Sequence, residues 1–206
     1  MCFDVQSSLL AWSLTYSISL YLFYRNQNYD RWNAGFIMTF STIQLLEAGI
    51  WVALDDKNQW MNDLLTRLVL LALLLQPLVQ NYMGYKFTGN GALGILSFVF
   101  LGVLVWAMLR VWRSTPNQFQ SSVGPKGHLM WSDEKSSSLL GGFAIGTIYV
   151  AGLFIPLFVM KDWKGLPLII VGAITALYSL LVAPRKEFAS YWCYTSVAYA
   201  IAALFV

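Results

Sequence analysis

The chain has 206 residues, of which 58% are hydrophobic and 11% charged, and its formal net charge is +3. These values lie far from the averages of soluble domains, which excludes a soluble globular enzyme. The basic residues form no stripe along the sequence, which argues against a nucleic-acid partner. The composition places the chain in a membrane, with the lipid bilayer as its partner.

The apolar residues form seven continuous runs. Roughly 20 apolar residues span the hydrocarbon core of a bilayer, and each run has about this length. A transmembrane barrel would show short alternating segments instead. We therefore predict an all-α polytopic transmembrane helical bundle with seven spans, which makes residues 1–206 a single multi-pass integral membrane domain. The predicted spans are residues 5–24, 32–54, 64–85, 90–112, 138–160, 165–184 and 188–206.

In the second predicted span, the stretch STIQLLEAGIW places a carboxylate among apolar residues. Glu47 precedes Asp55 by eight residues, so it lies on the order of 12 Å deep at 1.5 Å per helical residue. That depth is near the middle of a core about 30 Å thick, where a carboxylate must face protein or a wet cavity. Gln44, one turn earlier, shares the same helix face.

Three interpretations of Glu47 remain open. It can form a buried ion pair with Arg67 of the third predicted span. It can be protonated and hydrogen-bonded to Gln44 or to a tyrosine, because burial disfavours the charged form. It can also serve a function, as a group that binds an ion or a proton. Gln44, Glu47 and Arg67 are therefore the candidate residues of a polar site or ion pathway.

In the third predicted span, Pro77 frees a backbone carbonyl that the amides of Gln76 and Gln80 can satisfy. The resulting kink either is structural or faces a permeation path. The fifth predicted span carries Gly142 and Gly146 four residues apart, a pattern of small residues that suits close helix packing. This face can pack within the chain or build a homo-oligomer.

One connection is longer than the others. Residues 114–137 form a polar loop of about two dozen residues, which exceeds ordinary linker lengths. The loop holds the only histidine, His128, close to Trp131 and after a Gly-Pro turn. It is either a solvated surface segment or a cap, including Trp131, that folds over the mouth of the bundle.

The parity of seven spans places Cys2, Cys193 and His128 at the end of the bundle toward which Glu47 opens. Thiolate, imidazole and carboxylate groups bind zinc or copper, or build a nucleophile with its base. Cys2, Glu47 and His128 therefore form a candidate transition-metal site. The alternatives are that each cysteine is a small buried hydrophobe, that His128 is an ordinary loop residue, and that Cys2 and Cys193 form a disulfide.

Three segments carry a resemblance: MCFDVQSSL, YRNQNYDRWNAGFIMTFSTIQLLEAGIW and GHLMW. They resemble a poorly characterised family of small polytopic membrane proteins from bacteria, algae and large DNA viruses. Its members begin with Met-Cys-Phe or Met-Cys-Trp and carry a Gln-x-x-Glu pattern that ends in Trp on the second helix. Asp4 stands where that pattern usually has serine, which weakens a role for a hydroxyl there. The resemblance covers most of the chain, supplies no activity, and implies that Cys2, Glu47 and His128 belong together. The matching positions are Cys2, Phe3, Gln44, Glu47, Gly49, Trp51, His128 and Trp131.

These patterns favour a protein that binds or passes an ion, a proton or a small molecule through an intramembrane polar site, because a carboxylate near the bilayer midplane is costly without a role. A metal-dependent or thiol-dependent intramembrane enzyme is the alternative, with a transition metal such as zinc or copper as its cofactor. A structural or assembly subunit of a viral or organellar membrane is a further alternative.

Overall fold

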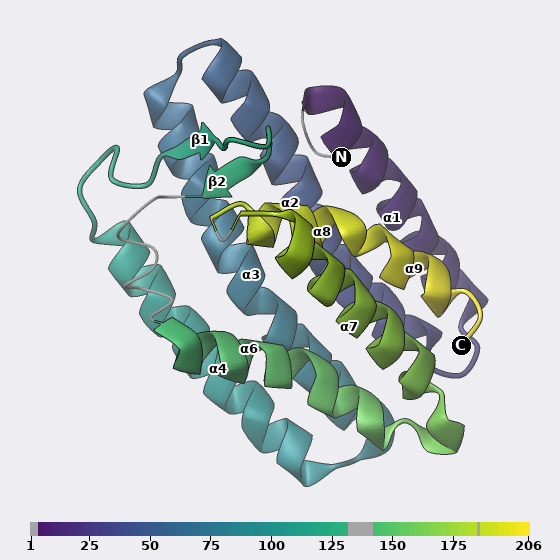
Figure 1. The fold of residues 1–206 in the computed structure, drawn as a ribbon. Coiled ribbons are helices and arrows are strands. Elements are labelled where there is room, and N and C mark those ends of the chain that lie inside the picture. The colour runs from purple at the N-terminus through teal and green to yellow at the C-terminus, as the bar shows by residue number, and fades with distance from the viewer. Residues whose placement is uncertain (1–3, 132–141, 185) are drawn as a thin grey trace.

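The computed structural model describes residues 4–131, 142–184 and 186–206, the side chains of 142–145 excepted. Helices dominate this part of the chain, and a short antiparallel hairpin lies across one end of the bundle (Figure 1). The predicted all-α class is thereby confirmed. The elements are α1 (Val5–Arg25), α2 (Asp30–Asp55), α3 (Gln59–Thr88), α4 (Gly91–Trp112), β1 (Ser121–Val123), β2 (Leu129–Trp131), α6 (Gly142–Phe154), the 3-10 turns η1 (Ile155–Val159) and η2 (Lys161–Trp163), α7 (Gly165–Val182), α8 (Phe188–Thr195) and α9 (Val197–Ala203).

Helices occupy all seven predicted apolar regions, but they differ in length. Within the described residues, four helices are long and apolar enough to cross a bilayer, namely α2, α3, α4 and α7. Helix α1 has 21 residues but is rich in serine and tyrosine. Helix α6 stops after 13 residues, and the last apolar region is divided at Ser196 into α8 and α9. A membrane protein fits this result, whereas the finer expectation of seven spans is not confirmed.

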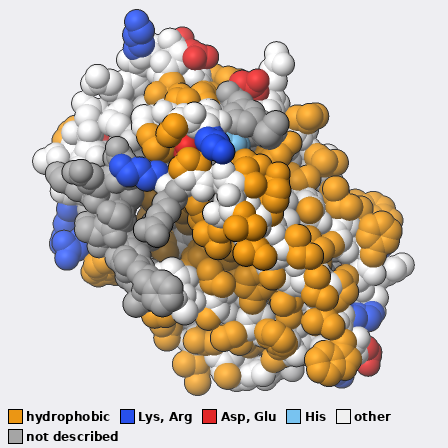
Figure 2. Space-filling view, viewed as in Figure 1, with side chains coloured by type: hydrophobic (Ala, Val, Ile, Leu, Met, Phe, Trp, Pro, Cys, Tyr) orange, Lys and Arg blue, Asp and Glu red, His pale blue; other side chains and the backbone are white. Residues whose placement is uncertain are grey.

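Apolar side chains cover much of the exterior, and a number of polar side chains are turned inward. On α1, Thr15 and Ser19 are buried, whereas Leu10 is 71% exposed. Thr15 Oγ1 donates to Ser41 Oγ at 2.9 Å, and Ser19 Oγ donates to the carbonyl of Ala34 at 2.9 Å, so these hydroxyls join α1 to α2. Figure 2 shows a broad apolar face with charged side chains toward its two ends. A soluble bundle would bury its apolar face instead, so this distribution suits a lipid surrounding.

Side-chain amides of α3 join it to α6 at the point where α6 ends. Pro156 has no N–H to donate to the carbonyl of Gly152, four residues earlier, and the change to 3-10 geometry releases the carbonyl of Leu153. Asn81 Nδ2 donates to Gly152 O at 2.9 Å, and Gln80 Nε2 donates to Leu153 O at 3.2 Å. The two amides therefore replace the backbone donors that α6 lacks.

The sequence predicts that the amides of Gln76 and Gln80 satisfy the carbonyl freed by Pro77, but in the structure these amides bind other groups. Gln80 serves α6, and its Oε1 accepts a hydrogen bond from Trp32 Nε1 at 3.0 Å. Gln80 thus connects α2, α3 and α6. Asn81 Nδ2 also donates to the carbonyl of Pro77 itself at 2.8 Å. Helix α3 continues through Pro77 without ending.

The C-terminal helices close the bundle against α1 and α2. Arg25, at the end of α1, forms an ion pair with Asp30 at 2.6 Å and donates to the carbonyl of Leu204 at 2.7 Å. Further along, the rings of Phe36 and Tyr199 pack edge to face with centroids 5.3 Å apart. The chain end and the α1–α2 turn are therefore held together by one guanidinium.

We expect Asn81→Leu to lower the free energy of unfolding by about 1–3 kcal/mol, because the carbonyl of Gly152 would lose its donor inside the bundle. Thermal and denaturant unfolding of the detergent-purified protein would measure the change. Gln59→Leu is the matched control, since Gln59 lies on the same helix with an exposed side chain and should change stability by less than about 0.5 kcal/mol. Equal stability of the two variants would contradict the capping role of Asn81.

Candidate functional site

The loop after α4 folds into a hairpin that α3 holds from one side. Strands β1 and β2 pair in antiparallel register, with Ser121 opposite Trp131. Asn62 of α3 binds the backbone of Ser121 twice, donating to its carbonyl and accepting from its N–H, both at 2.9 Å. Thr66 Oγ1 and Ser121 Oγ share a further hydrogen bond of 2.7 Å. These buried contacts fix β1 on α3, so the described part of the loop is a folded element over the bundle end.

Arg67 also holds this loop, and its ionic partner differs from the sequence-based interpretation. Its Nε donates to Asp63 Oδ2 at 2.6 Å, one turn earlier on α3. The rest of the guanidinium binds the carbonyls of Val111 and Thr115, where α4 ends, and lies over the ring of Phe119. The interpretation of Arg67 as the ionic partner of Glu47 is therefore wrong. Asp63 satisfies Arg67, and the pair anchors the start of the loop.

From the opposite side, Glu187 holds the turn of the hairpin. Its side chain is fully buried, and its two carboxylate oxygens accept hydrogen bonds from the N–H groups of Lys126 at 3.2 Å and His128 at 3.1 Å. Gly124 lies against this carboxylate so closely that an added Cβ would lie 2.3 Å from the carboxyl carbon. A carboxylate that accepts two backbone N–H groups binds the turn strongly. The hairpin is thus fixed between α3 and the segment that leads into α8.

His128 points into the molecule. It is 1% exposed, and its ring packs against Tyr191 of α8 with ring centroids 4.5 Å apart. Burial lowers the pKa of His128 below its ordinary value, and the nearby carboxylate of Glu187 opposes this shift in part. The imidazole is therefore held preferentially in its neutral form, in which it can accept a proton or bind a metal.

Glu47 lies in the interior of α2 and is fully buried. Ser190 Oγ of α8 donates a hydrogen bond to Glu47 Oε1. Gln44, one turn before Glu47, is also fully buried. Trp51 Nε1, one turn after Glu47, is buried and has no hydrogen-bond partner within the described residues. The Gln44–Glu47–Trp51 face of α2 thus turns inward.

An apolar shell surrounds these polar groups. It joins α2, α3 and α8 to the hairpin, and it includes Trp131 and Cys193. Cys193 is a free, buried thiol. The buried members of the shell are Ile43, Ile50, Trp51, Val69, Ala72, Leu129, Trp131 and Cys193.

The structure brings several predicted residues to one end of the bundle. Glu47 contacts Ser190, and His128 contacts Tyr191, so successive residues of α8 meet the two groups. Trp131 belongs to the apolar shell, whereas Arg67 serves the loop. Cys2 lies outside the described residues. Within those residues, no group of three or more His, Cys, Asp or Glu side chains is placed to hold a metal ion.

Sequence reasoning missed Glu187, Ser190 and Asp63. Ser190 lies in an apolar run where a serine resembles an ordinary packing residue, and Glu187 lies beside basic residues in a short loop. For Asp63 a signal existed, because it precedes Arg67 by four residues on one helix face.

Comparison of this chain with protein-family models, with curated proteins and with solved structures gave no match.

We expect Glu187→Ala to detach the hairpin turn without unfolding the helices. The N–H groups of Lys126 and His128 would lose their acceptor, and hydrogen exchange in residues 124–128 should become about ten- to a hundredfold faster. Exchange followed by mass spectrometry measures this change peptide by peptide. Glu187→Gln keeps one acceptor oxygen and should give a smaller effect. Unchanged exchange in Glu187→Ala would show that the α3 contacts alone hold the hairpin.

Stability should also depend on pH through His128. Its folded pKa lies below the unfolded value near 6.5, so the unfolded chain binds a proton that the folded chain does not. The contribution of neutral His128 is present above about pH 6.5 and is lost as the pH falls through the folded pKa. Melting temperatures between pH 5 and pH 8 should therefore fall less steeply toward acid in His128→Gln. Since His128 is the only histidine, equal slopes in the two proteins would exclude this linkage.

Proposed function

We propose that this multi-pass membrane protein binds or passes a proton, a cation or a small molecule through an intramembrane polar site, with Glu47 as the binding group. The observation that carries the proposal is the complete burial of Glu47 in the interior of α2, with Ser190 Oγ donating to its Oε1. A carboxylate at such a position is costly, and intramembrane carboxylates commonly mark ion or proton pathways.

Two observations support a functional rather than a purely structural role of Glu47. Arg67 is satisfied by Asp63 and by loop carbonyls, so neutralising Arg67 is not what Glu47 does. The buried N–H of Trp51, which has no partner among the described residues, adds a donor one turn away that a bound group can use. The site therefore offers a carboxylate, a hydroxyl and an indole donor within an apolar shell.

The hairpin gives this site a boundary toward the nearest aqueous side. It lies over the end of the bundle at which α2 ends and α8 begins (Figure 1). Leu129 and Trp131 of β2 pack in the same apolar shell as Ile43 and Ile50 of α2. A proton or ion that reaches Glu47 from this side would pass the hairpin, so the contacts that hold the hairpin should control access.

We expect Glu47→Gln to reduce the flux of the transported proton or cation at least tenfold, because the amide keeps the shape but loses the charge and the titratable group. Proton and alkali-cation flux into liposomes that contain the purified protein would measure it. Asp30→Asn is the matched control, since it neutralises another buried carboxylate, at the start of α2 and at the opposite end of the bundle.

Flux through Glu47→Gln equal to that of the unaltered protein would contradict the transport proposal. The same preparations, analysed for zinc and copper by mass spectrometry, distinguish the enzyme alternative. Near-stoichiometric metal in the unaltered protein that is lost in Glu47→Gln, together with unchanged flux, would favour a metal-dependent function instead.

A further inference from the structure

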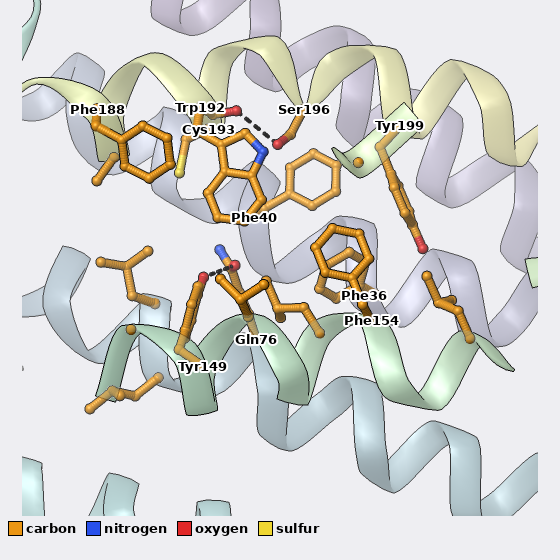
Figure 3. A pocket seen from close by; sticks show the side chains of 18 residues that line it. Phe36, Phe40, Gln76, Tyr149, Phe154, Phe188, Trp192, Cys193, Ser196 and Tyr199 are labelled. Atoms are coloured by element: carbon orange, nitrogen blue, oxygen red, sulfur yellow. Dashed lines mark hydrogen bonds between the residues drawn. The ribbon is translucent and has the colours of Figure 1, made fainter. Parts of the chain in front are cut away.

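A second site lies beside α8, the helix that also contacts Glu47 through Ser190. It is a partly open cavity of about 240 Å³ between α2, α3, α6, α7 and the C-terminal helices (Figure 3). Aromatic side chains from several of these helices form much of its wall, among them Phe36, Phe40, Phe154 and Trp192. Apolar cavities with aromatic walls and few polar groups are typical of sites for small ligands.

The volume sets the size of an occupant. An apolar protein cavity of about 150 Å³ stays free of water and binds benzene. This cavity is larger, so it suits a ligand bigger than a single unsubstituted ring. Its apolar wall disfavours water and favours a membrane-soluble molecule.

A buried side-chain amide points into this apolar space. Gln76 of α3 is 4% exposed and lines the cavity. Its Oε1 accepts a hydrogen bond from Tyr149 of α6 at 2.5 Å, whereas its Nε2 has no hydrogen-bond partner within the described residues. Figure 3 shows this amide nitrogen pointing from α3 into the space that faces Trp192. A buried N–H without an acceptor is costly, so the site is incomplete without an acceptor on the occupant.

The route of entry follows from residues that line the cavity and also reach the exterior. Gly146 and Val150 of α6 both do so, and Val150 is 40% exposed. Around them the outer surface of α6 is apolar, with Ile148 58% exposed. The opening beside α6 therefore faces an apolar part of the surface, which favours a lipid-soluble ligand.

We propose that this cavity binds a lipophilic carbonyl compound, whose oxygen accepts a hydrogen bond from Gln76 Nε2 and whose apolar body fills the aromatic space. Carbonyl oxygen is the acceptor that a lipid-soluble molecule carries most readily without a charge. Two sources share this chemistry, an acyl ester from the lipid and a membrane-soluble quinone. The proposal goes beyond the Glu47 site and does not depend on it.

The test is equilibrium binding of radiolabelled methyl decanoate and of radiolabelled duroquinone to the detergent-purified full chain, with decane as the probe that lacks a carbonyl. We expect saturable binding of the ester or the quinone, and the one that binds identifies the source. Gln76→Leu should weaken that binding about tenfold, whereas it should leave the affinity for decane within about twofold.

A second variant tests the location independently of Gln76. A Cβ added at Gly146 would meet no atom within 4 Å, so Gly146→Phe can occupy the open space without a backbone clash. It should abolish binding of all three probes. Gly102→Phe is the matched control, because Gly102 of α4 is equally open and does not line the cavity.

Four results would overturn the proposal. Decane that binds as tightly as the ester and the quinone would remove the role of the carbonyl, as would unchanged carbonyl affinity in Gln76→Leu. Unchanged binding in Gly146→Phe would place the ligand elsewhere. A dimer that Gly146→Phe dissociates, without saturable binding of any probe, would assign the opening to a second copy of the chain. Glu47→Gln should bind the probes normally, so failure of the ion-site proposal remains distinguishable.

Discussion

The pairing of polar side chains on α3 with backbone groups of other segments is the constraint on which the rest of the structure depends. In an apolar interior every backbone carbonyl or N–H that lacks its regular helix hydrogen bond needs another partner, because no water is present there to bind it. At one end of α3, Asn62 and the Asp63–Arg67 pair bind the loop that leads into the hairpin. Toward the other end, Gln80 and Asn81 bind carbonyls that α6 releases at Pro156. Two segments without regular hydrogen bonding are thereby fixed to one helix.

The position of the hairpin decides what surrounds Glu47. With β1 held on α3, the turn reaches the segment before α8, where Glu187 binds the N–H groups of Lys126 and His128. This brings the ring of His128 against α8 next to the residue that binds Glu47. Each of these contacts, Glu187 with the hairpin turn, His128 with Tyr191, and Ser190 with Glu47, joins residues of different segments. The contact between Glu47 and Ser190 joins two helices, whereas the anchored hairpin adds His128, Leu129 and Trp131 to this end of the bundle.

The helical regions were predictable from the sequence because continuous apolar runs depend only on composition along the chain. The partners of buried polar groups were less predictable, because several candidates compete and the nearest in space need not be obvious in sequence. For Arg67 the helical spacing to Asp63 held the answer, whereas the depth argument favoured Glu47. The contact between Ser190 and Glu47 joins residues 143 positions apart, and no local pattern encodes it. Pro156 was visible in the apolar run, but its effect on the length of α6 depends on the amides of α3.

Helix α8 contributes to both the polar site and the apolar cavity, and Cys193 belongs to the apolar shell of the first and to the wall of the second. Phe188, Trp192 and Cys193 line the cavity, whereas Ser190 and Tyr191 meet Glu47 and His128. The helix is only eight residues long, and the chain after it continues into α9 at Ser196, whose hydroxyl bonds back to the carbonyl of Trp192. Ser190 and Trp192 are two positions apart on this helix and therefore point to nearly opposite sides, so the hydrogen bond on Glu47 and the aromatic wall of the cavity are separate contacts of one short helix.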